Sequence, residues 1–398
     1  MKIKQLLLIP ILLMSCTQLG DAQELKFSGY FENQFFPQKI GDSMKLQDYN
    51  KLRLDLSADI GKNLSFNADY IYRTYHGATS YSALDFLPEK LAAPLAAVPS
   101  QLISEFNLQF TDEIFLDNAY VTLYAKHLTV RIGKQQLPWG TGYTWNPTDI
   151  FNAKNTLDPT YEKVGVNAFK MEFPFATEGL VTAIFTPEAE WENSTKAVKV
   201  KQHFFGFDMS ASFVEKDQDS FADAQIFGLP LFNSFKEKRQ LVGGDFSGGL
   251  FGLGFWGEGA YNKMEMSDNY GQYLVGTDYT FENGLYLTSE YYRNELGKSD
   301  KNDYTLADWV RLFSAEGENL GQDYLFAGQR YPISELWNWS NFALINLNDK
   351  SAVLFPWFDY SYNDNTEIMF VGYLPVGKKE TEFGEFGYGG FARIRVYF

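Results

Sequence analysis

The chain has 398 residues, of which 17% are aromatic, but its hydrophobic share is only 45% and its mean hydropathy is −0.27, so large rings are diluted by polar neighbours. One Cys and three His residues argue against a disulfide framework and against a Cys-based or His-rich metal site. The formal net charge of −16 argues against nucleic acid as a partner, because such a binder needs clustered Lys and Arg to neutralise phosphates.

The first residues have the pattern of a secretory signal peptide, with two lysines before an apolar run over 6–14 that is too short to span a bilayer as a helix. Two processing sites are open. Cleavage after Ala22 would make residues 1–22 the signal peptide, whereas the segment before Cys16 resembles a lipobox and would end the signal at residue 15, with Cys16 lipidated. Either site predicts an exported protein.

The rest of the chain alternates polar and apolar residues with a period of two. In KLRLDLSADI (51–60), aliphatic residues fall on one face and charged residues on the other, and a three-residue turn leads into a second alternating segment. The same hairpin unit recurs to the C-terminus. It predicts 18 strands, near residues 25–36, 49–60, 64–75, 113–125, 128–136, 164–175, 179–187, 197–205, 206–216, 237–247, 249–262, 270–281, 284–296, 322–331, 335–347, 351–362, 366–375 and 386–398.

Connections between these strands are sorted by length. Turns of two to four residues alternate with long loops, the longest at 76–112, 137–163, 217–236 and 297–321. Such sorting is typical of a transmembrane β-barrel with short periplasmic turns and long extracellular loops. We therefore predict that residues 23–398 form one all-β domain, a single antiparallel transmembrane β-barrel of 18 strands, with 16 as the alternative. An even count places both termini on the periplasmic side.

The aromatic residues fit the same architecture. Tyr and Trp gather near predicted strand ends, where they suit the two interfacial girdles of a barrel: Tyr49, Tyr75, Tyr81, Trp337, Trp339, Tyr360 and Tyr362. The chain ends in FARIRVYF, which resembles the closing strand of bacterial outer-membrane proteins. That resemblance implies that Phe398 is an assembly signal, that the barrel-assembly machinery is a partner, and that the protein lies in the outer membrane of a Gram-negative bacterium, among lipid and lipopolysaccharide.

Function then rests on the inward face and on the loops. Six basic residues fall on the predicted inward faces of neighbouring strands, and three acidic residues fall roughly opposite. The pore-lining candidates are Lys51, Arg53, Arg73, Arg131, Arg393 and Arg395 on the basic side and Asp208, Asp278 and Glu290 on the acidic side. Two interpretations stay open: a transverse field across the pore, or a generic polar lumen whose charges are paired locally.

Two loops carry further candidates. The apolar loop 76–112 could fold inward and narrow the pore, cap the mouth, or pack on the rim. The loop 137–163 combines aromatic rings with amide and carboxylate side chains, which either bind sugars or only fix the loop. Its motif residues are Trp139, Gly140, Asn146, Pro147 and Asp149.

This loop also carries a family resemblance. RIGKQ (131–135), WG (139–140), NPTD (146–149) and a glycine at 165 are similar to the signature hairpin of alginate-export-like and related substrate-selective outer-membrane porins. The resemblance implies an outer-membrane channel for small polar or anionic solutes. An alginate pore would be expected to have a strongly basic lumen, whereas the charges here are mixed.

Catalysis is not expected, since the few His residues have no evident nucleophile partner and no Walker loop or metal-ligand cluster occurs. We predict no catalytic residues, no cofactor and no metal. The expected function is a water-filled porin for passive or weakly selective diffusion of small polar or anionic solutes. The alternative is a non-conducting barrel whose loops bind a ligand, partner or surface polymer. The oligomeric state is left open.

Overall fold

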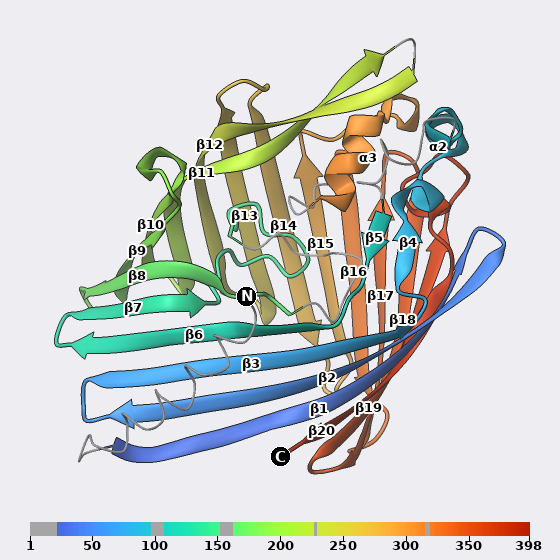
Figure 1. Ribbon diagram of the computed structural model, residues 1–398. Coiled ribbons are helices and arrows are strands. Elements are labelled where there is room, and N and C mark those ends of the chain that lie inside the picture. The colour runs from blue at the N-terminus through green and yellow to red at the C-terminus, as the bar shows by residue number, and fades with distance from the viewer. Residues whose placement is uncertain (1–21, 97–106, 152–161, 227–228, 315–318) are drawn as a thin grey trace.

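A computed structural model describes residues 22–96, 107–151, 162–226, 229–314 and 319–398 (Figure 1). Residues 1–21, which hold Cys16 and all of the predicted signal peptide except Ala22, lie outside the described residues. Within them, the dominant element is one closed antiparallel sheet whose strands follow the chain order around a ring.

All 18 predicted strands are present, so the predicted fold class is confirmed. Their bounds are β1 (Ala22–Ile40), β2 (Ser43–Ile60), β3 (Leu64–Gly77), β6 (Glu113–Ala125), β7 (Leu128–Gln135), β8 (Val166–Phe175), β9 (Gly179–Thr186), β10 (Thr195–Phe204), β11 (Phe207–Ile226), β12 (Leu229–Leu250), β13 (Leu253–Met264), β14 (Tyr270–Thr280), β15 (Tyr286–Asn294), β16 (Asp323–Pro332), β17 (Trp337–Asn346), β18 (Ser351–Asn363), β19 (Thr366–Val376) and β20 (Gly389–Tyr397).

The ring closes between β1 and β20, which pair antiparallel with Tyr30 opposite Tyr397. Beyond the last residue of β20, the amide of Phe398 donates to the Gly29 carbonyl at 3.0 Å, and the backbone oxygen of Phe398 accepts the Gly29 amide at 3.1 Å. A side chain at Gly29 would meet the Arg53 carbonyl oxygen at 2.2 Å, so only glycine fits at this close approach. Closure leaves no unpaired edge, which is what a sheet needs in order to cross a bilayer.

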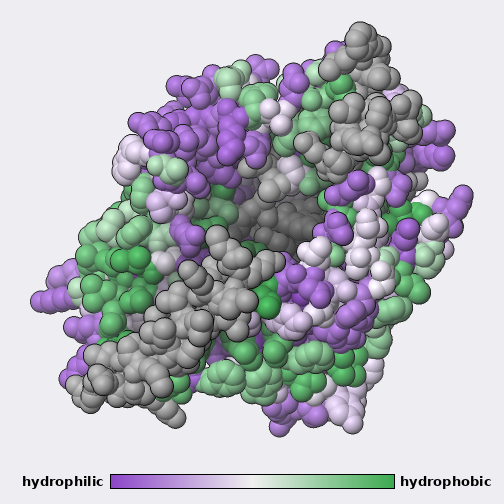
Figure 2. All heavy atoms as spheres, in the orientation of Figure 1, coloured by the Kyte–Doolittle hydropathy of each residue, from purple (hydrophilic) through white to green (hydrophobic). Residues whose placement is uncertain are grey.

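Alternate residues of each strand face outward and are apolar. Exposed outward side chains include Phe31, Val121, Phe213, Leu354 and Ile394. Figure 2 shows hydrophobic residues gathered over the lower and left flanks of the molecule and hydrophilic residues over its upper left edge. The apolar outer face fits the hydrocarbon of a bilayer, and the polar half of each strand faces the lumen.

None of the helices in the described ranges is long and apolar enough to cross a membrane.

The prediction of a loop at 217–236 is wrong. Most of it forms a continuation of the β11–β12 hairpin, in which Gln218 pairs with Glu237 and Phe221 with Ser234. Both faces of this stretch mix polar residues with apolar ones such as Phe221, Leu231 and Phe232. The strict alternation by which a lipid-facing strand is recognised therefore disappears, although the backbone pairing continues. The following turn is also displaced from its predicted place around 247–249, since it lies at Phe251 and Gly252, both with positive φ.

The described part of loop 76–112 lies at the end of the barrel that carries the long connections, here called the loop end. It forms β4 (Ser80–Ser82), η1 (Ala83–Phe86), α2 (Glu89–Ala96) and β5 (Asn107–Gln109). Leu95 of α2 packs with Trp309 of α3 (Leu306–Phe313), and the two helices lie close together in Figure 1. Of the three alternatives for this loop, the described residues therefore fit packing at the mouth or rim.

Two members of the predicted aromatic girdle are also corrected. Tyr49 and Tyr75 face the lumen, where the Tyr49 hydroxyl donates to Glu32 at 2.7 Å. Both tyrosines have odd numbers, as do Lys51, Arg53 and Arg73 on the inward faces of β2 and β3. Whether a residue of these strands faces the lumen or the lipid is therefore decided by this alternation and not by its nearness to a strand end. At the opposite end of the barrel, the rings of Trp337 and Tyr360 stack with centroids 4.4 Å apart, and their place in a girdle stays a prediction.

Candidate functional site

The connection between β7 and β8 folds into the barrel. Its described residues, 136–151 and 162–165, are called the inward loop here. In Figure 1 this connection lies within the ring of strands, in front of β13–β15. The sequence pointed to loop 76–112 as the candidate for inward folding, but the next long connection takes that place.

The first anchor of the inward loop is Glu290 on β15. Its carboxylate accepts the backbone amides of Tyr143, Thr144 and Trp145 at 2.7, 3.0 and 3.1 Å. It also accepts the indole N–H of Trp256 at 2.7 Å. Expected to line the pore, Glu290 is instead fully buried, because successive loop amides converge on it as on a bound anion.

A second anchor, Glu258 on β13, works in the same way. It accepts the amides of Thr141 at 2.8 Å and Thr148 at 2.6 Å, and the Thr148 hydroxyl at 2.7 Å. Gly140 lies directly over this carboxylate with φ +82°, and a Cβ there would meet a carboxylate oxygen at 2.7 Å. Glycine is therefore required both by the backbone conformation and by the close approach.

The other motif residues hold the loop in shape. Trp139 is buried, with its ring 5.5 Å from that of Phe151 and the Lys199 ammonium 5.3 Å from its centroid. The Asn146 carbonyl accepts the amide of Asp149, next to the buried Pro147. Asp149 in turn binds Lys163 at 2.5 Å, which joins the two described parts of the loop. These contacts fit the interpretation in which the motif fixes the loop.

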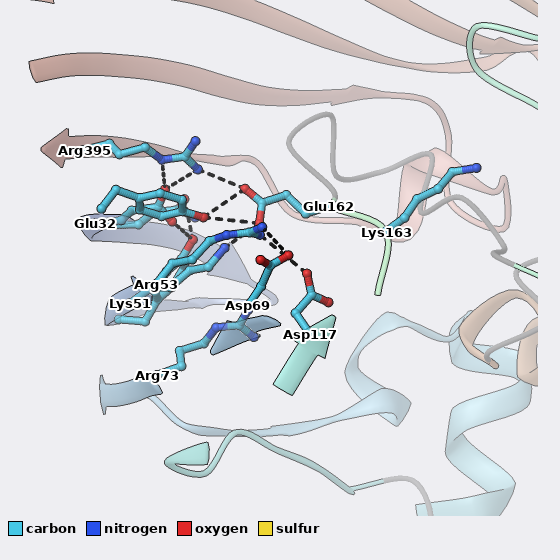
Figure 3. Close-up of polar contacts among 12 residues, drawn as sticks. Glu32, Lys51, Arg53, Asp69, Arg73, Asp117, Glu162, Lys163 and Arg395 are labelled. Carbon is cyan, nitrogen blue, oxygen red and sulfur yellow. Dashed lines mark hydrogen bonds and ion pairs between the residues drawn. The ribbon is translucent and has the colours of Figure 1, made fainter. Parts of the chain in front are cut away.

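At its other end, the inward loop reaches the wall formed by β20, β1 and β2. Glu162 lies between Lys51 and Arg395, as Figure 3 shows. The Lys51 ammonium donates to Glu162 at 2.5 Å, and the Arg395 guanidinium donates to it at 3.1 Å. The described residues of the loop thus contact two opposite sides of the barrel wall.

Basic side chains on this wall are each paired with an acid. Arg53 contacts Asp55, Asp69 and Asp117, at 2.7, 2.9 and 3.5 Å. Arg73 contacts Glu113 at 2.8 Å.

Glu32, which the sequence analysis did not single out, binds Arg395 at 2.5 Å and lies 3.7 Å from Arg393. Of the two interpretations of the lumen, local pairing of charges is therefore the one that fits this wall.

The remaining pore-lining candidates lie apart from this wall. Arg131 on β7 donates to the Thr122 hydroxyl at 3.2 Å and lies over the ring of Tyr120. Asp208 binds Lys201 at 2.6 Å near the β10–β11 turn. Asp278 on β14 accepts the hydroxyl of Tyr286 at 2.9 Å.

Sequence reasoning missed three residues of this site. Glu32 and Glu258 occupy the inward parity of their strands, which alternation alone could have found. Glu162 belongs to a loop, where no periodicity indicates which way a side chain points. Its position depends on the fold of the whole loop.

The electrostatics of Glu162 follow from these contacts. Burial alone would raise the pKa of its carboxyl, but Lys51, Arg395 and Arg53 outweigh burial and lower the pKa to about 2. Glu162 is therefore ionised throughout the physiological pH range. Among the described residues, no group of three or more His, Cys, Asp or Glu side chains is arranged to hold a metal ion.

No protein-family model matches the sequence, and no curated protein matches it. Solved structures do resemble the fold. OccAB1 of Acinetobacter baumannii aligns over 95% of this chain and 97% of its own, with a TM-score of 0.59 and 9% identity. A Rhodopseudomonas blastica porin mutant (TM-score 0.46, 10% identity, covering 94% of this chain and 100% of its own) and Salmonella typhi OmpF (0.44, 13%, covering 94% and 97%) align less well. The likeness to OccAB1 shows that this chain shares its barrel fold.

Proposed function

We propose that this chain is an outer-membrane channel for passive, weakly selective diffusion of small polar or anionic solutes. The single observation that carries the proposal is the inward loop, held on one wall by Glu258 and Glu290 and reaching the opposite wall through Glu162. An 18-stranded barrel encloses more space than its own side chains fill, and a loop anchored across it would set the size of the path that remains.

Supporting features are the apolar outer face, which suits a bilayer, and the mixed charges of the lumen wall. We infer that the protein is exported, lies in the outer membrane of a Gram-negative bacterium among lipid and lipopolysaccharide, and uses Phe398 as a signal to the barrel-assembly machinery. The resemblance to alginate-export-like porins and the binding of sugars by the inward loop stay predictions.

Liposome swelling tests the proposal. Vesicles containing the refolded barrel should swell in isotonic solutions of small neutral sugars, at a rate that falls steeply as the sugar grows from a pentose to a trisaccharide. Swelling no faster than in protein-free vesicles, with the barrel shown to be folded by circular dichroism, would contradict it. That outcome would favour a non-conducting barrel whose loops bind a ligand, partner or surface polymer.

A further inference from the structure

The carboxylate of Glu162 sits in a site built by the barrel wall. One of its oxygens accepts the Tyr30 hydroxyl at 3.2 Å and the Arg395 guanidinium at 3.1 Å. The other accepts the Lys51 ammonium at 2.5 Å. Tyr30 and Lys51 are themselves buried, so the donors are fixed by packing before any anion arrives. Figure 3 shows Lys51 of β2 and Arg395 of β20 pointing toward Glu162.

Three cations of this wall, Lys51, Arg393 and Arg395, form their described ion pairs with only two acids, Glu32 and Glu162. Glu32 is the acid of β1 that faces them, and its carboxylate is engaged by Arg395, Arg393 and the hydroxyl of Tyr49. The ion pair of Lys51 is made with Glu162, and the Lys51 side chain is only 5% exposed. Without Glu162, three cations would face one acid.

A buried cation that loses its partner is strongly destabilised. The site therefore needs an anion, whichever molecule supplies it.

The anion that fills the site comes from a loop. Glu162 lies outside the strands, and 39% of its side chain is exposed, whereas Glu32 is buried in the wall. A solute carboxylate that enters the lumen would have the same two oxygens and the same charge as the Glu162 side chain. It could accept from the same three donors without any rearrangement of the barrel.

We propose that Tyr30, Lys51 and Arg395 form a carboxylate-binding site in the lumen, which Glu162 occupies when the channel is empty and from which a small monocarboxylate solute displaces it. The proposal rests on the proposed channel function and names the solute class that this lumen would retain. Glu162 then acts as an internal competitor, which lowers the affinity for the solute and keeps the bound state short-lived.

The test compares Glu162→Gln with Glu113→Gln, a matched variant that also removes one acid from a lumen ion pair, the one with Arg73. Binding of propionate to the folded barrel in detergent micelles is measured by saturation-transfer NMR, with propionamide as the neutral probe. Propionate should bind Glu162→Gln at least about tenfold more tightly than the wild type, which corresponds to about 1.4 kcal/mol. Propionamide should bind neither the wild type nor Glu162→Gln. Glu113→Gln should bind propionate with the same affinity as the wild type.

Equal propionate affinity in the wild type and both variants would overturn the proposal, and so would tighter binding in both variants. Inorganic phosphate binding to Glu162→Gln as tightly as propionate would overturn the assignment to a carboxylate. The double variant Lys51→Gln/Glu162→Gln should lose the gained affinity, and if it does not fold, the two single variants still decide. Because binding is measured in micelles, its failure is distinct from a failure of conduction, which liposome swelling reports.

Discussion

Glu290→Ala is the perturbation that most directly tests how the inward loop is held. In the wild type, one buried carboxylate accepts three consecutive loop amides and the indole of Trp256. The variant leaves all four donors without their acceptor in a site that is closed to water. The loop must then either keep its place with unsatisfied amides or leave the wall of β15.

The loss of docking free energy follows from the hydrogen bonds that the variant removes. A hydrogen bond to a charged group contributes about 1.5–3 kcal/mol, and neighbouring bonds to one acceptor are not additive. Losing four such bonds should therefore weaken docking of the loop by about 4–6 kcal/mol. Water does not screen these hydrogen bonds, since Glu290 is fully buried. Glu258 would still hold the amides of Thr141 and Thr148, so the segment between them is released from β15 while the barrel remains closed.

Single-channel recording in planar bilayers measures the result. Glu290→Ala should have a larger and noisier conductance than the wild type, because the loop no longer holds one position across the lumen. Asp278→Ala is the matched control: it removes an inward acid from the neighbouring β14, whose hydrogen bond is to Tyr286. If Glu290→Ala conducts like the wild type and like this control, the inward loop does not restrict the channel.

Three further predictions concern single positions. Glu382 is buried in the connection between β19 and β20, and burial raises its pKa to about 7. The folded state therefore holds a proton that the unfolded state releases near pH 4.5, so stability should be greatest below pH 4.5 and fall by roughly 3 kcal/mol up to pH 7. Glu382→Gln should flatten this pH dependence of the unfolding temperature. Gly140→Ala should lower the unfolding temperature more than Gly61→Ala, since both have positive φ but only the first meets Glu258. Phe398→Ala should reduce the folded barrel recovered from cell envelopes far more than the yield of refolding in detergent.

Most of the fold is encoded locally and could be predicted from the sequence. A strand between lipid and water must alternate, so residues such as those of 51–60 reveal both the strand and the side that each residue faces. The prediction fails where a strand does not lie between lipid on one side and water on the other. The end of the β11–β12 hairpin mixes polar and apolar residues on both faces, and without strict alternation its strands resembled a loop.

The site was less accessible to sequence reasoning. Alternation placed Lys51 and Arg395 on the inward face, but their partner Glu162 lies 111 residues from Lys51 and 233 from Arg395 in the chain. Alternation also placed Glu290 correctly on the inward face, but it predicted a carboxylate exposed to the pore. No pattern in the neighbouring sequence shows that a loop will cover this residue. Which loop folds inward is decided by long-range hydrogen bonds, and those have no periodic signal.

The central claim is that the barrel encloses a conducting path whose wall charges are paired locally. Reversal-potential measurement across a planar bilayer with a tenfold KCl gradient tests it most directly. The account predicts stepwise, ohmic currents that reverse within a few tens of millivolts of zero, since Arg53, Arg73 and Arg395 each have an acidic partner. No current from a barrel verified as folded, or a reversal near the limit for a single ion, would contradict it.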